Sequence, residues 1–491
     1  MNLATALERT SERQPGAVAV VFEGASTTYA AVQHQAVRAA VSLSDLGVQP
    51  GDRVAIWMAN HPSFISALYG IWRAGAVAVP VHSALTQPEA AHIFEDAGTS
   101  VVFIGHDQLD AAAPWIEDLG MHALLTPRDA PKSAPPPEQN YPTPPLVDRG
   151  DDDLALIQYT AGTSGLPKGA MLTHGNLRAN LDQMRSVRIA VTSDDVALCV
   201  LPLFHIYGLN VVLNLGIDVG ARLVLFERFD PKASIDAIRN EKISVIAAAP
   251  PAYVAWLGVD GASSADFSSV RAAVSGAAPL AKETLTSFRE RFGIDIWEGY
   301  GLTETAPALT TTAVGGVPKA ACVGRPLPGV ELRLVDEDGD EVDDGDPGEI
   351  VVRGPNVFTG YWNGEQETAE AFADGWFKTG DVGVFDDDGD LFIVDRRRDM
   401  VIVSGFNVYP REIEDVLRKQ PSVTDVAVVG EPDQATGERV HAFVVGDVSA
   451  QEVLDFAARS LAPYKLPKAV DIVSDIPRNA AGKVLRRELR R

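Results

Sequence analysis

The chain has 491 residues, of which 46% are hydrophobic and 22% charged, so it is long enough for several buried cores and lacks the composition of a disordered protein. Its formal net charge of −25 disfavours general binding to nucleic acids or anionic membranes, because no basic surface offsets the repulsion from phosphate. The two cysteines, Cys199 and Cys322, lie far apart and outside any CxxC pattern, so neither a disulfide framework nor a zinc site is expected, and a cytoplasmic location fits.

The N-terminal residues 1–16 combine charged side chains with a helical pattern and contain no apolar segment typical of a signal peptide. The longest apolar run, residues 243–259, contains a Pro-Pro pair and is too short to span a bilayer. We therefore expect no integral membrane segment.

Most of the chain alternates short β-branched runs with helical segments, which is the α/β pattern. The expected strands cover residues 54–57, 77–81, 100–104, 154–158, 196–201, 222–226, 245–249 and 271–275. A proline-rich stretch at residues 126–145 is predicted to be an irregular connector between two α/β units.

A loop rich in glycine and hydroxyl residues follows the strand predicted at 154–158. In residues 159–169, Tyr-Thr-Ala-Gly-Thr-Ser-Gly-Leu-Pro-Lys-Gly, Thr163 and Ser164 stand between two glycines, and Lys168 follows closely. Glycines let backbone N–H groups approach an anion, hydroxyls add hydrogen bonds, and the lysine adds positive charge. The spacing differs from that of a Walker loop, yet it predicts phosphate binding; the alternative is a flexible surface turn.

From residue 323 onward the sequence becomes rich in short β-runs separated by Asp-Gly turns, which predicts a small antiparallel, barrel-like unit. Its expected strands cover residues 330–335, 349–353, 381–385 and 391–394. The acidic clusters at 336–340 and 386–390 lack the spacing and the terminal Glu of an EF-hand, so we interpret them as hairpin turns rather than calcium loops.

A charged segment at residues 395–399 is interpreted as a hinge before a compact tail. The tail is predicted to be a small α+β domain, with helices at 410–419 and 450–459 and strands at 423–429, 440–445 and 468–473.

Several segments in a fixed order complete one larger pattern. They are residues 159–169, Leu-Pro-Leu-Phe-His-Ile-Tyr-Gly at 201–208, Gly-Tyr-Gly-Leu-Thr-Glu at 299–304, Thr-Gly-Asp at 379–381, Asp395-Arg396 running to Val-Ser-Gly-Phe-Asn-Val-Tyr-Pro at 403–410, and Pro-Arg-Asn-Ala-Ala-Gly-Lys at 477–483. Together they resemble the adenylate-forming superfamily of acyl-CoA synthetases, adenylation domains and luciferases over essentially the full length. The resemblance implies an N-terminal AMP-binding domain at 1–395, a hinge at 396–399 and a mobile C-terminal lid domain at 400–491.

The resemblance implies a two-step reaction that uses ATP, CoA and Mg²⁺. A carboxylate attacks the α-phosphate of ATP, pyrophosphate leaves, and a thiol then attacks the acyl-AMP. Because the first step brings an anion onto a polyanion, positive charge must neutralise the transition state.

By the same resemblance, ATP or AMP is bound by Thr160, Thr163, Ser164, Gly165, Lys168, Tyr300, Gly301, Thr303, Asp381 and Arg396. Thr163, Ser164 and Lys168 are implied to hold the β- and γ-phosphates, and Thr303 the α-phosphate. Tyr300 is expected against the adenine, Asp381 at the ribose hydroxyls, and Arg396 as a second ribose or phosphate contact. Ala161 stands where the family usually has Ser, so one hydroxyl of the loop is lost.

The residues implied to be catalytic are Lys483, Glu304, Thr303 and Lys168. Glu304 is expected to bind Mg²⁺, the alternative being a solvated surface acid. Lys483 would bridge the carboxylate and the α-phosphate in the first half-reaction only, although an exposed lysine near the C-terminus usually has no such role.

The remaining implied residues serve the acid and the thiol. His205 and Gly276 are expected at the acyl pocket, where His205 would shape carboxylate entry without acting as a base; a packed core histidine is the alternative. Arg398 occupies the hinge position, where relatives often carry Asp or Lys. Gly405 is expected to line the CoA tunnel, and a tight turn explains it equally well.

We therefore predict an AMP-forming acyl-CoA synthetase of fatty acid metabolism, acting on a fatty or similar apolar acid. The alternatives are a ligase for short-chain or aromatic acids, an enzyme that loads a carrier protein, and a nucleotide-binding regulator without catalysis. Neither the chain length of the acid nor a homodimer can be decided from the sequence, and no nucleic-acid partner is expected.

Overall fold

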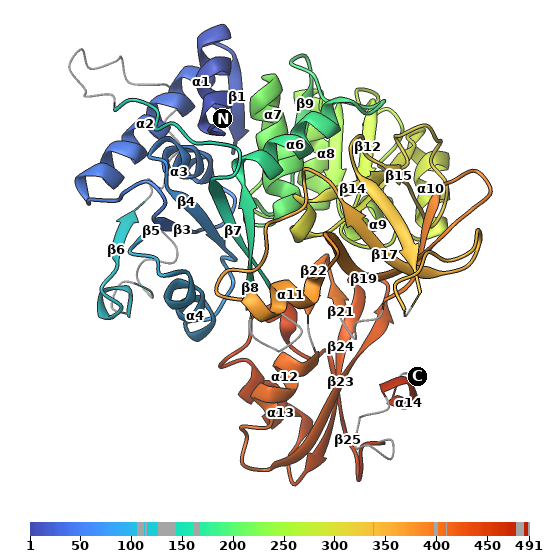
Figure 1. Ribbon diagram of the computed structural model, residues 1–491. Coiled ribbons are helices and arrows are strands. Elements are labelled where there is room, and N and C mark those ends of the chain that lie inside the picture. The colour runs from blue at the N-terminus through green and yellow to red at the C-terminus, as the bar shows by residue number, and fades with distance from the viewer. Residues whose placement is uncertain are drawn as a thin grey trace.

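The computed structural model describes residues 1–105, 112, 115–125, 144–161, 167–336, 338–396, 401–408, 410–477 and 486–489. Within these residues the α/β chain forms a large N-terminal domain and a small C-terminal domain, which lies below the large domain in Figure 1. The α/β class expected from the sequence is confirmed. The connector predicted at 126–145 falls almost entirely outside the described residues.

A six-stranded sheet forms the first half of the large domain, in the order β6-β5-β3-β4-β7-β8. Its strands are β3 (Arg53–Trp57), β4 (Val77–Val81), β5 (Val101–Ile104), β6 (His122–Leu125), β7 (Leu154–Ala161) and β8 (Pro167–Thr173). All pairs are parallel except β7 and β8, which pair as an antiparallel hairpin with Thr160 opposite Lys168. The loop at 162–166 therefore joins two antiparallel strands, unlike the strand-to-helix loop of a P-loop.

A second, longer sheet changes character along its length. It runs β2-β1-β10-β9-β11-β12-β13 and continues through β14, β15, β20, β19 and β17 to β16, with β18 beside β19. The first part comprises β1 (Val18–Phe22), β2 (Ala25–Thr28), β9 (Val196–Cys199), β10 (Arg222–Leu225), β11 (Val245–Ala248), β12 (Ala272–Ser275) and β13 (Ile296–Gly301). The second part comprises β14 (Ala308–Thr311), β15 (Cys322–Pro326), β16 (Glu331–Val335), β17 (Gly348–Arg353), β18 (Phe372–Ala373), β19 (Trp376–Phe385) and β20 (Leu391–Arg396). From β13 onward neighbouring strands are antiparallel, as the Asp-Gly turns predict.

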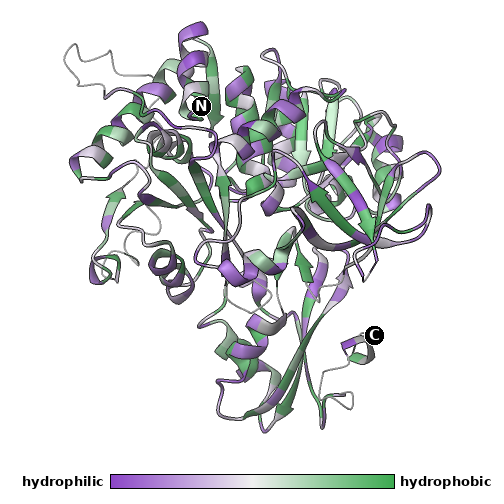
Figure 2. Cartoon of the chain, in the orientation of Figure 1, coloured by the Kyte–Doolittle hydropathy of each residue, from purple (hydrophilic) through white to green (hydrophobic). Residues whose placement is uncertain are grey.

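Helices cover both faces of these sheets. The apolar core between the two sheets contains α1 (Ala4–Arg13), α2 (Tyr29–Asp45), α3 (Pro62–Arg73), α6 (His174–Arg185), the π-helix η1 (Tyr207–Asn214) and α7 (Leu215–Val219). The outer face of the long sheet is covered by α8 (Pro231–Glu241), α9 (Pro250–Leu257) and α10 (Lys282–Phe292), and that of the six-stranded sheet by α4 (Gln87–Ala97). Figure 2 shows hydrophobic colour along the inner parallel strands, and β4 is buried at every position, as a strand covered on both faces requires.

The small domain is a five-stranded sheet with helices on both faces. Its strands are β21 (Val401–Val403), β22 (Phe406–Val408), β23 (Val423–Asp433), β24 (Gly437–Gly446) and β25 (Ala469–Ile472). One face packs on α12 (Pro410–Leu417) and α13 (Ala450–Ala457), which is followed by the short helix η3 (Pro463–Lys465). On the other face, Ile476 packs against β23 and β24 together with Leu489, which lies in α14 (Arg486–Leu489). Among the described residues, no helix combines the length and apolarity needed to span a bilayer.

Candidate active site

A cavity opens beyond the carboxyl ends of β12 and β13, the position at which open α/β sheets bind their ligands. Its walls come from those strand ends, the turn after β13, the start of η1, β14 and β19 of the large domain, and one residue of the small domain. Including its open mouth, the space measures about 1120 Å³. Of the residues predicted for the site, this cavity brings together Thr160, His205, Gly276, Tyr300, Gly301, Thr303, Glu304, Asp381 and Gly405.

Two of the predicted nucleotide-binding residues contact each other. The hydroxyl of Tyr300, on β13, donates a 2.8 Å hydrogen bond to Oδ2 of Asp381, on β19. The backbone N–H of Asp381 in turn donates to Oγ1 of Thr379, whose hydroxyl donates to the carbonyl of Ile350. Asp381 is buried, so these bonds hold its carboxylate in one orientation at the cavity wall.

Glu304 lies in the short helix η2 (Thr303–Thr305) and keeps only 7% of its surface exposed. Its Oε1 accepts a 2.8 Å hydrogen bond from the hydroxyl of Tyr361. The Nζ of Lys168 lies 5.5 Å from the centre of the Tyr361 ring and 3.9 Å from Oε1 of Glu367. Tyr361 therefore contacts both Glu304 of η2 and Lys168 of β8, the acid of one predicted motif and the lysine of another.

The turn that carries Thr303 and Glu304 depends on a glycine. A Cβ atom at Gly301 would lie 1.8 Å from the carbonyl oxygen of Pro307, so no side chain fits without moving that backbone. The turn is further fixed by Thr305, whose Oγ1 accepts from the N–H of Leu302. The two sequence neighbours Thr303 and Glu304 are thus presented on a rigid support.

His205 lies at the end of the cavity near η1. Burial lowers its pKa to about 4, so the imidazole is neutral at pH 7. Its Nδ1 accepts a 3.2 Å hydrogen bond from the N–H of Tyr207. His205 is therefore a packed, hydrogen-bonded residue that also lines the cavity, and its role at an acyl pocket stays a prediction.

The apolar wall of the cavity is built by Tyr207 against Gly276. The Tyr207 hydroxyl lies 3.3 Å from the carbonyl oxygen of Val274 and donates to it. A Cβ atom at Gly276 would come within 3.1 Å of the Tyr207 ring, so the absence of a side chain there is what lets the ring occupy this place.

A second cavity lies between the two domains and shares Thr160, His205, Ile206 and Thr303 with the first. The large domain contributes Pro80, His82, Leu85, Ile93, Gln158, Tyr159, Pro167 and Phe204, and the small domain contributes Phe406, Tyr464 and Lys465. The β21–β22 hairpin brings Gly405 to the first cavity, with a φ of 84° that favours glycine. A Cβ atom at Gly405 would contact Ala277 and Ala249 at 3.7 and 3.8 Å, so the turn and the cavity wall are one feature.

The pattern of the AMP-binding enzyme family matches residues 7–362, and that of the AMP-binding enzyme C-terminal domain matches residues 412–483. The chain belongs to the AMP-binding enzyme family. Among the relatives of this AMP-binding enzyme, a feruloyl-CoA synthase of Amycolatopsis sp is 37% identical over 98% of this chain and 97% of its own. A long-chain-fatty-acid–CoA ligase of Bacillus subtilis is 34% identical over 99% of this chain and 94% of its own.

Two solved structures of relatives differ in how well they superpose on this AMP-binding enzyme. A double mutant of the o-succinylbenzoate CoA synthetase of Bacillus subtilis, bound with its product analogue, is 29% identical with a TM-score of 0.88, covering 99% of this chain and 98% of its own. ATP-bound MatB of Rhodopseudomonas palustris is 33% identical with a TM-score of 0.74, covering 100% and 98%. The structure with the product analogue has the lower sequence identity and yet the higher TM-score. The whole-chain arrangement here is therefore nearer to that structure than to ATP-bound MatB.

Several predicted residues of this AMP-binding enzyme cannot be placed. Thr163, Ser164 and Gly165 of the phosphate loop, Arg398 at the hinge position, and Lys483 lie outside the described residues. For Arg396 the backbone is described, opposite Asp381 on neighbouring strands, but not the side chain. The roles of these residues stay predictions.

Sequence reasoning did not single out Tyr361, Tyr207 or Thr379, although all three contact predicted site residues. Tyr207 lies inside the motif at 201–208 and Thr379 inside the motif at 379–381, so these two residues could have been found from the motifs. Tyr361 has no such signal, because it reaches Glu304 only through the fold, across 57 positions of sequence.

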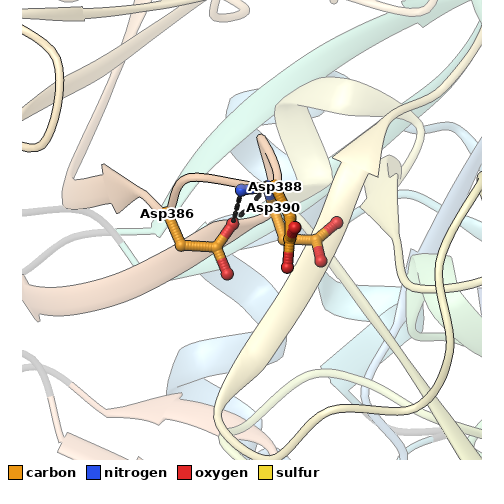
Figure 3. Close-up of side chains that lie close together, drawn as sticks. All are labelled: Asp386, Asp388 and Asp390. Atoms are coloured by element: carbon orange, nitrogen blue, oxygen red, sulfur yellow. Dashed lines mark hydrogen bonds between the residues drawn. The ribbon is translucent and has the colours of Figure 1, made fainter.

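The acidic turn at 386–390 lies apart from the residues that line the two cavities. Figure 3 shows Asp386, Asp388 and Asp390 grouped at the turn between β19 and β20, with Asp386 accepting from backbone N–H groups of the turn. Nζ of Lys319 forms ion pairs with all three carboxylates. The turn therefore joins two antiparallel strands as a hairpin, as interpreted from the sequence, and Lys319 together with Arg325 offsets part of its negative charge.

Proposed function

We propose that this enzyme activates an apolar carboxylic acid with ATP, releases pyrophosphate, and passes the acyl group from acyl-AMP to the thiol of CoA. The observation that carries the proposal is the composition of one cavity. The bonded pair Tyr300–Asp381 and the buried Glu304 line it together with the apolar wall of Tyr207 and Gly276. Groups suited to a nucleotide thus face groups suited to an acid across a single space.

At the nucleotide end, we propose that Asp381 accepts hydrogen bonds from the ribose hydroxyls and that the Tyr300 ring lies against the adenine. Thr303 and Thr160 would donate to phosphate oxygens, and Lys168 would supply positive charge as pyrophosphate leaves. In this step the acid oxygen forms a bond to the α-phosphorus while the bond to pyrophosphate breaks. Lys483 would add charge at the carboxylate and the α-phosphate.

The site fits Mg²⁺, which we propose as the cofactor. Glu304 offers a carboxylate at the cavity wall, oriented by Tyr361, and Mg²⁺ in such sites is held by one or two carboxylates together with substrate phosphates. When bound there, the ion would neutralise phosphate charge.

At the acid end, the neutral His205 and the Tyr207 ring favour an apolar acyl group. The carboxylate nucleophile needs no base, which agrees with a histidine whose pKa lies well below 7. The relatives named above act on an aromatic acid and on long-chain fatty acids, so we include both classes among the candidate substrates.

We propose that the thiol of CoA reaches the acyl-AMP through the second cavity. This cavity shares the lining residues Thr160, His205, Ile206 and Thr303 with the first, and both domains form its walls. There the sulfur forms a bond to the acyl carbon, the bond from that carbon to AMP breaks, and AMP leaves. The glycine at 405 would leave room for the thiol arm beside Ala277 and Ala249.

The small domain is proposed to use different orientations in the two steps, about a hinge at 396–399 between domains at 1–395 and 400–491. Among the described residues, the small domain contributes only Gly405 to the first cavity. The arrangement described here, with Gly405 at the first cavity, suits the thiol step. The cytoplasm, which supplies ATP and CoA, is the location we propose.

The test is mass spectrometry of the products formed from Mg-ATP, CoA and a panel of short, medium, long-chain and aromatic acids. We expect acyl-CoA and AMP in equal amounts, loss of activity in Asp381→Asn, and unchanged activity in the matched control Asp388→Asn, whose carboxylate lies in the exposed turn. Acyl-AMP without thioester would point to a carrier protein as acceptor. Formation of ADP, or no product from any acid, would overturn the proposal.

A further inference from the structure

A buried ion pair joins the two domains beside the second cavity. The side chain of Lys465, in η3 of the small domain, is 3% exposed. Its Nζ donates to Oε1 of Glu412 in the same domain at 2.7 Å and to Oε1 of Glu89 in the large domain at 3.1 Å. Both carboxylates are themselves largely buried, so water competes little for these contacts.

Glu89 is prepared for this contact by its own helix. Its Oε2 accepts from the backbone N–H and the hydroxyl of Thr86, which caps the first turn of α4. This leaves Oε1 turned toward the small domain, where it also accepts from the N–H of Ala462 at 3.4 Å. The cap fixes the rotamer of Glu89, so the carboxylate loses little further freedom when Lys465 arrives.

The residue next to Lys465 extends the contact with aromatic rings. Tyr464 stacks on His82 of the large domain with ring centres 4.7 Å apart and planes at 15°. The same His82 ring contacts Phe406 at 5.0 Å and Phe204 at 4.2 Å. Phe406 follows Gly405 directly, so the docking that forms the Lys465–Glu89 pair also brings the β21–β22 hairpin to the first cavity.

Of the three charged residues Lys465, Glu412 and Glu89, only Glu89 belongs to the large domain. Lys465 and Glu412 belong to the same domain, whereas Glu89 belongs to the other, so a rotation of the small domain would separate Glu89 from Lys465. A charge pair that is buried in one arrangement and separated in another favours that arrangement chiefly through specificity, because a misdocked charge is left without its partner.

We propose that Glu89 and Lys465 are positioning residues that select the domain orientation used for thioester formation. The inference rests on the proposed two-step function and on rotation of the small domain between the steps. It assigns the pair to the second half-reaction, and acyl-AMP formation does not depend on it.

The experiment measures the two half-reactions separately in Glu89→Gln, Lys465→Met and the double variant. Glutamine keeps the shape of Glu89 and an oxygen for the α4 cap. For the single variants we expect acyl-CoA formation from preformed acyl-AMP in one turnover to fall at least tenfold, while ATP–pyrophosphate exchange stays within twofold or rises. The double variant falls no further than the worse single one, since both changes remove the same contact. Glu95→Gln, an exposed charge on the same helix, is the matched control and changes neither.

Hydrogen exchange of the peptides covering 82–94 and 460–465 tests the contact without CoA or substrate. We expect faster exchange in Glu89→Gln and Lys465→Met than in the unmodified enzyme and Glu95→Gln. Equal losses in both half-reactions, or no loss in either variant, would overturn the proposal, as would unchanged exchange. If the unmodified enzyme makes acyl-AMP but no acyl-CoA, the proposed acceptor is wrong, and the exchange experiment still decides whether the pair holds the domains together.

Discussion

Replacing Tyr361 with Phe removes one hydroxyl and tests the proposed role of Glu304. The ring packing is retained, since the Phe358 and Tyr361 ring centres lie 4.9 Å apart, and the 2.8 Å hydrogen bond to Oε1 of Glu304 is lost. A hydrogen bond to a charged group contributes about 1.5–3 kcal/mol. Partners that orient a metal-binding carboxylate typically change metal affinity by about 10- to 100-fold.

We therefore expect Tyr361→Phe to require about 10- to 100-fold more Mg²⁺ for half-maximal ATP–pyrophosphate exchange. At limiting Mg²⁺, kcat/KM should fall by about 10- to 150-fold, which is the same loss of free energy expressed as a rate. The control is Tyr300→Phe, which removes the hydroxyl bonded to Asp381 and should raise the KM for ATP without moving the Mg²⁺ dependence. An unchanged Mg²⁺ midpoint in Tyr361→Phe would refute the assignment of Glu304 as the metal ligand.

Three further variants test other parts of the site. Lys483→Ala should slow acyl-AMP formation by about 10²- to 10³-fold, which is the effect of losing one contact to transition-state charge. Formation of acyl-CoA from supplied acyl-AMP should stay unchanged, and equal losses in the two half-reactions would contradict the proposed role of Lys483. Gly276→Ala places a methyl group 3.1 Å from the buried Tyr207 ring, and overpacking costs about 1–3 kcal/mol. The KM for bulky acids should therefore rise about 5- to 150-fold with the KM for ATP unchanged, as steady-state rates on linear and branched acids will show. Burial raises the pKa of Glu298 to about 7, so the folded enzyme holds this proton more tightly than the unfolded chain and loses stability as the pH rises from about 4.5 to 7. Glu298→Gln should therefore gain stability relative to the unmodified enzyme between pH 4 and pH 8, by up to about 3 kcal/mol in urea unfolding; a pH-independent difference would exclude this linkage.

The sequence predicted local patterns well, and pairing partners less well. The strand expected at 77–81 coincides with β4, whose residues are all apolar or proline. The strand expected at 154–158 extends to Ala161 because β8 pairs with it. Strand β8 itself is not expected from the sequence, because it begins with Pro-Lys-Gly, a sequence typical of a loop. The strand expected at 423–429 likewise extends to Asp433, since β24 offers a partner along its whole length. Strand length is decided by the pairing partner, which the pattern of one segment does not reveal.

The site shows the same contrast between residues that a local motif identifies and residues that only a contact identifies. Tyr300, Glu304 and Asp381 could be named from ordered motifs, and the cavity brings them together as those motifs imply. Tyr361 and Lys465 could not be named, because their importance lies in contacts with Glu304 and Glu89 that cross between elements and domains. A lysine or tyrosine without its partner in view has no distinguishing pattern.

The position of β13 has a consequence for how this fold can diversify. Its first residues pair in parallel with β12 up to Glu298, and its end, which carries Tyr300, pairs in antiparallel fashion with β14, so the strand is held in the sheet along its whole length. The walls that would select the acid and the nucleotide are therefore parts of a fixed scaffold, while the hairpin bearing Gly405 arrives on a separately folded unit with its own core. Choice of acid and handling of the thiol can thus change independently, and exchange of the small domain between relatives should alter transfer to the acceptor while leaving acid preference intact.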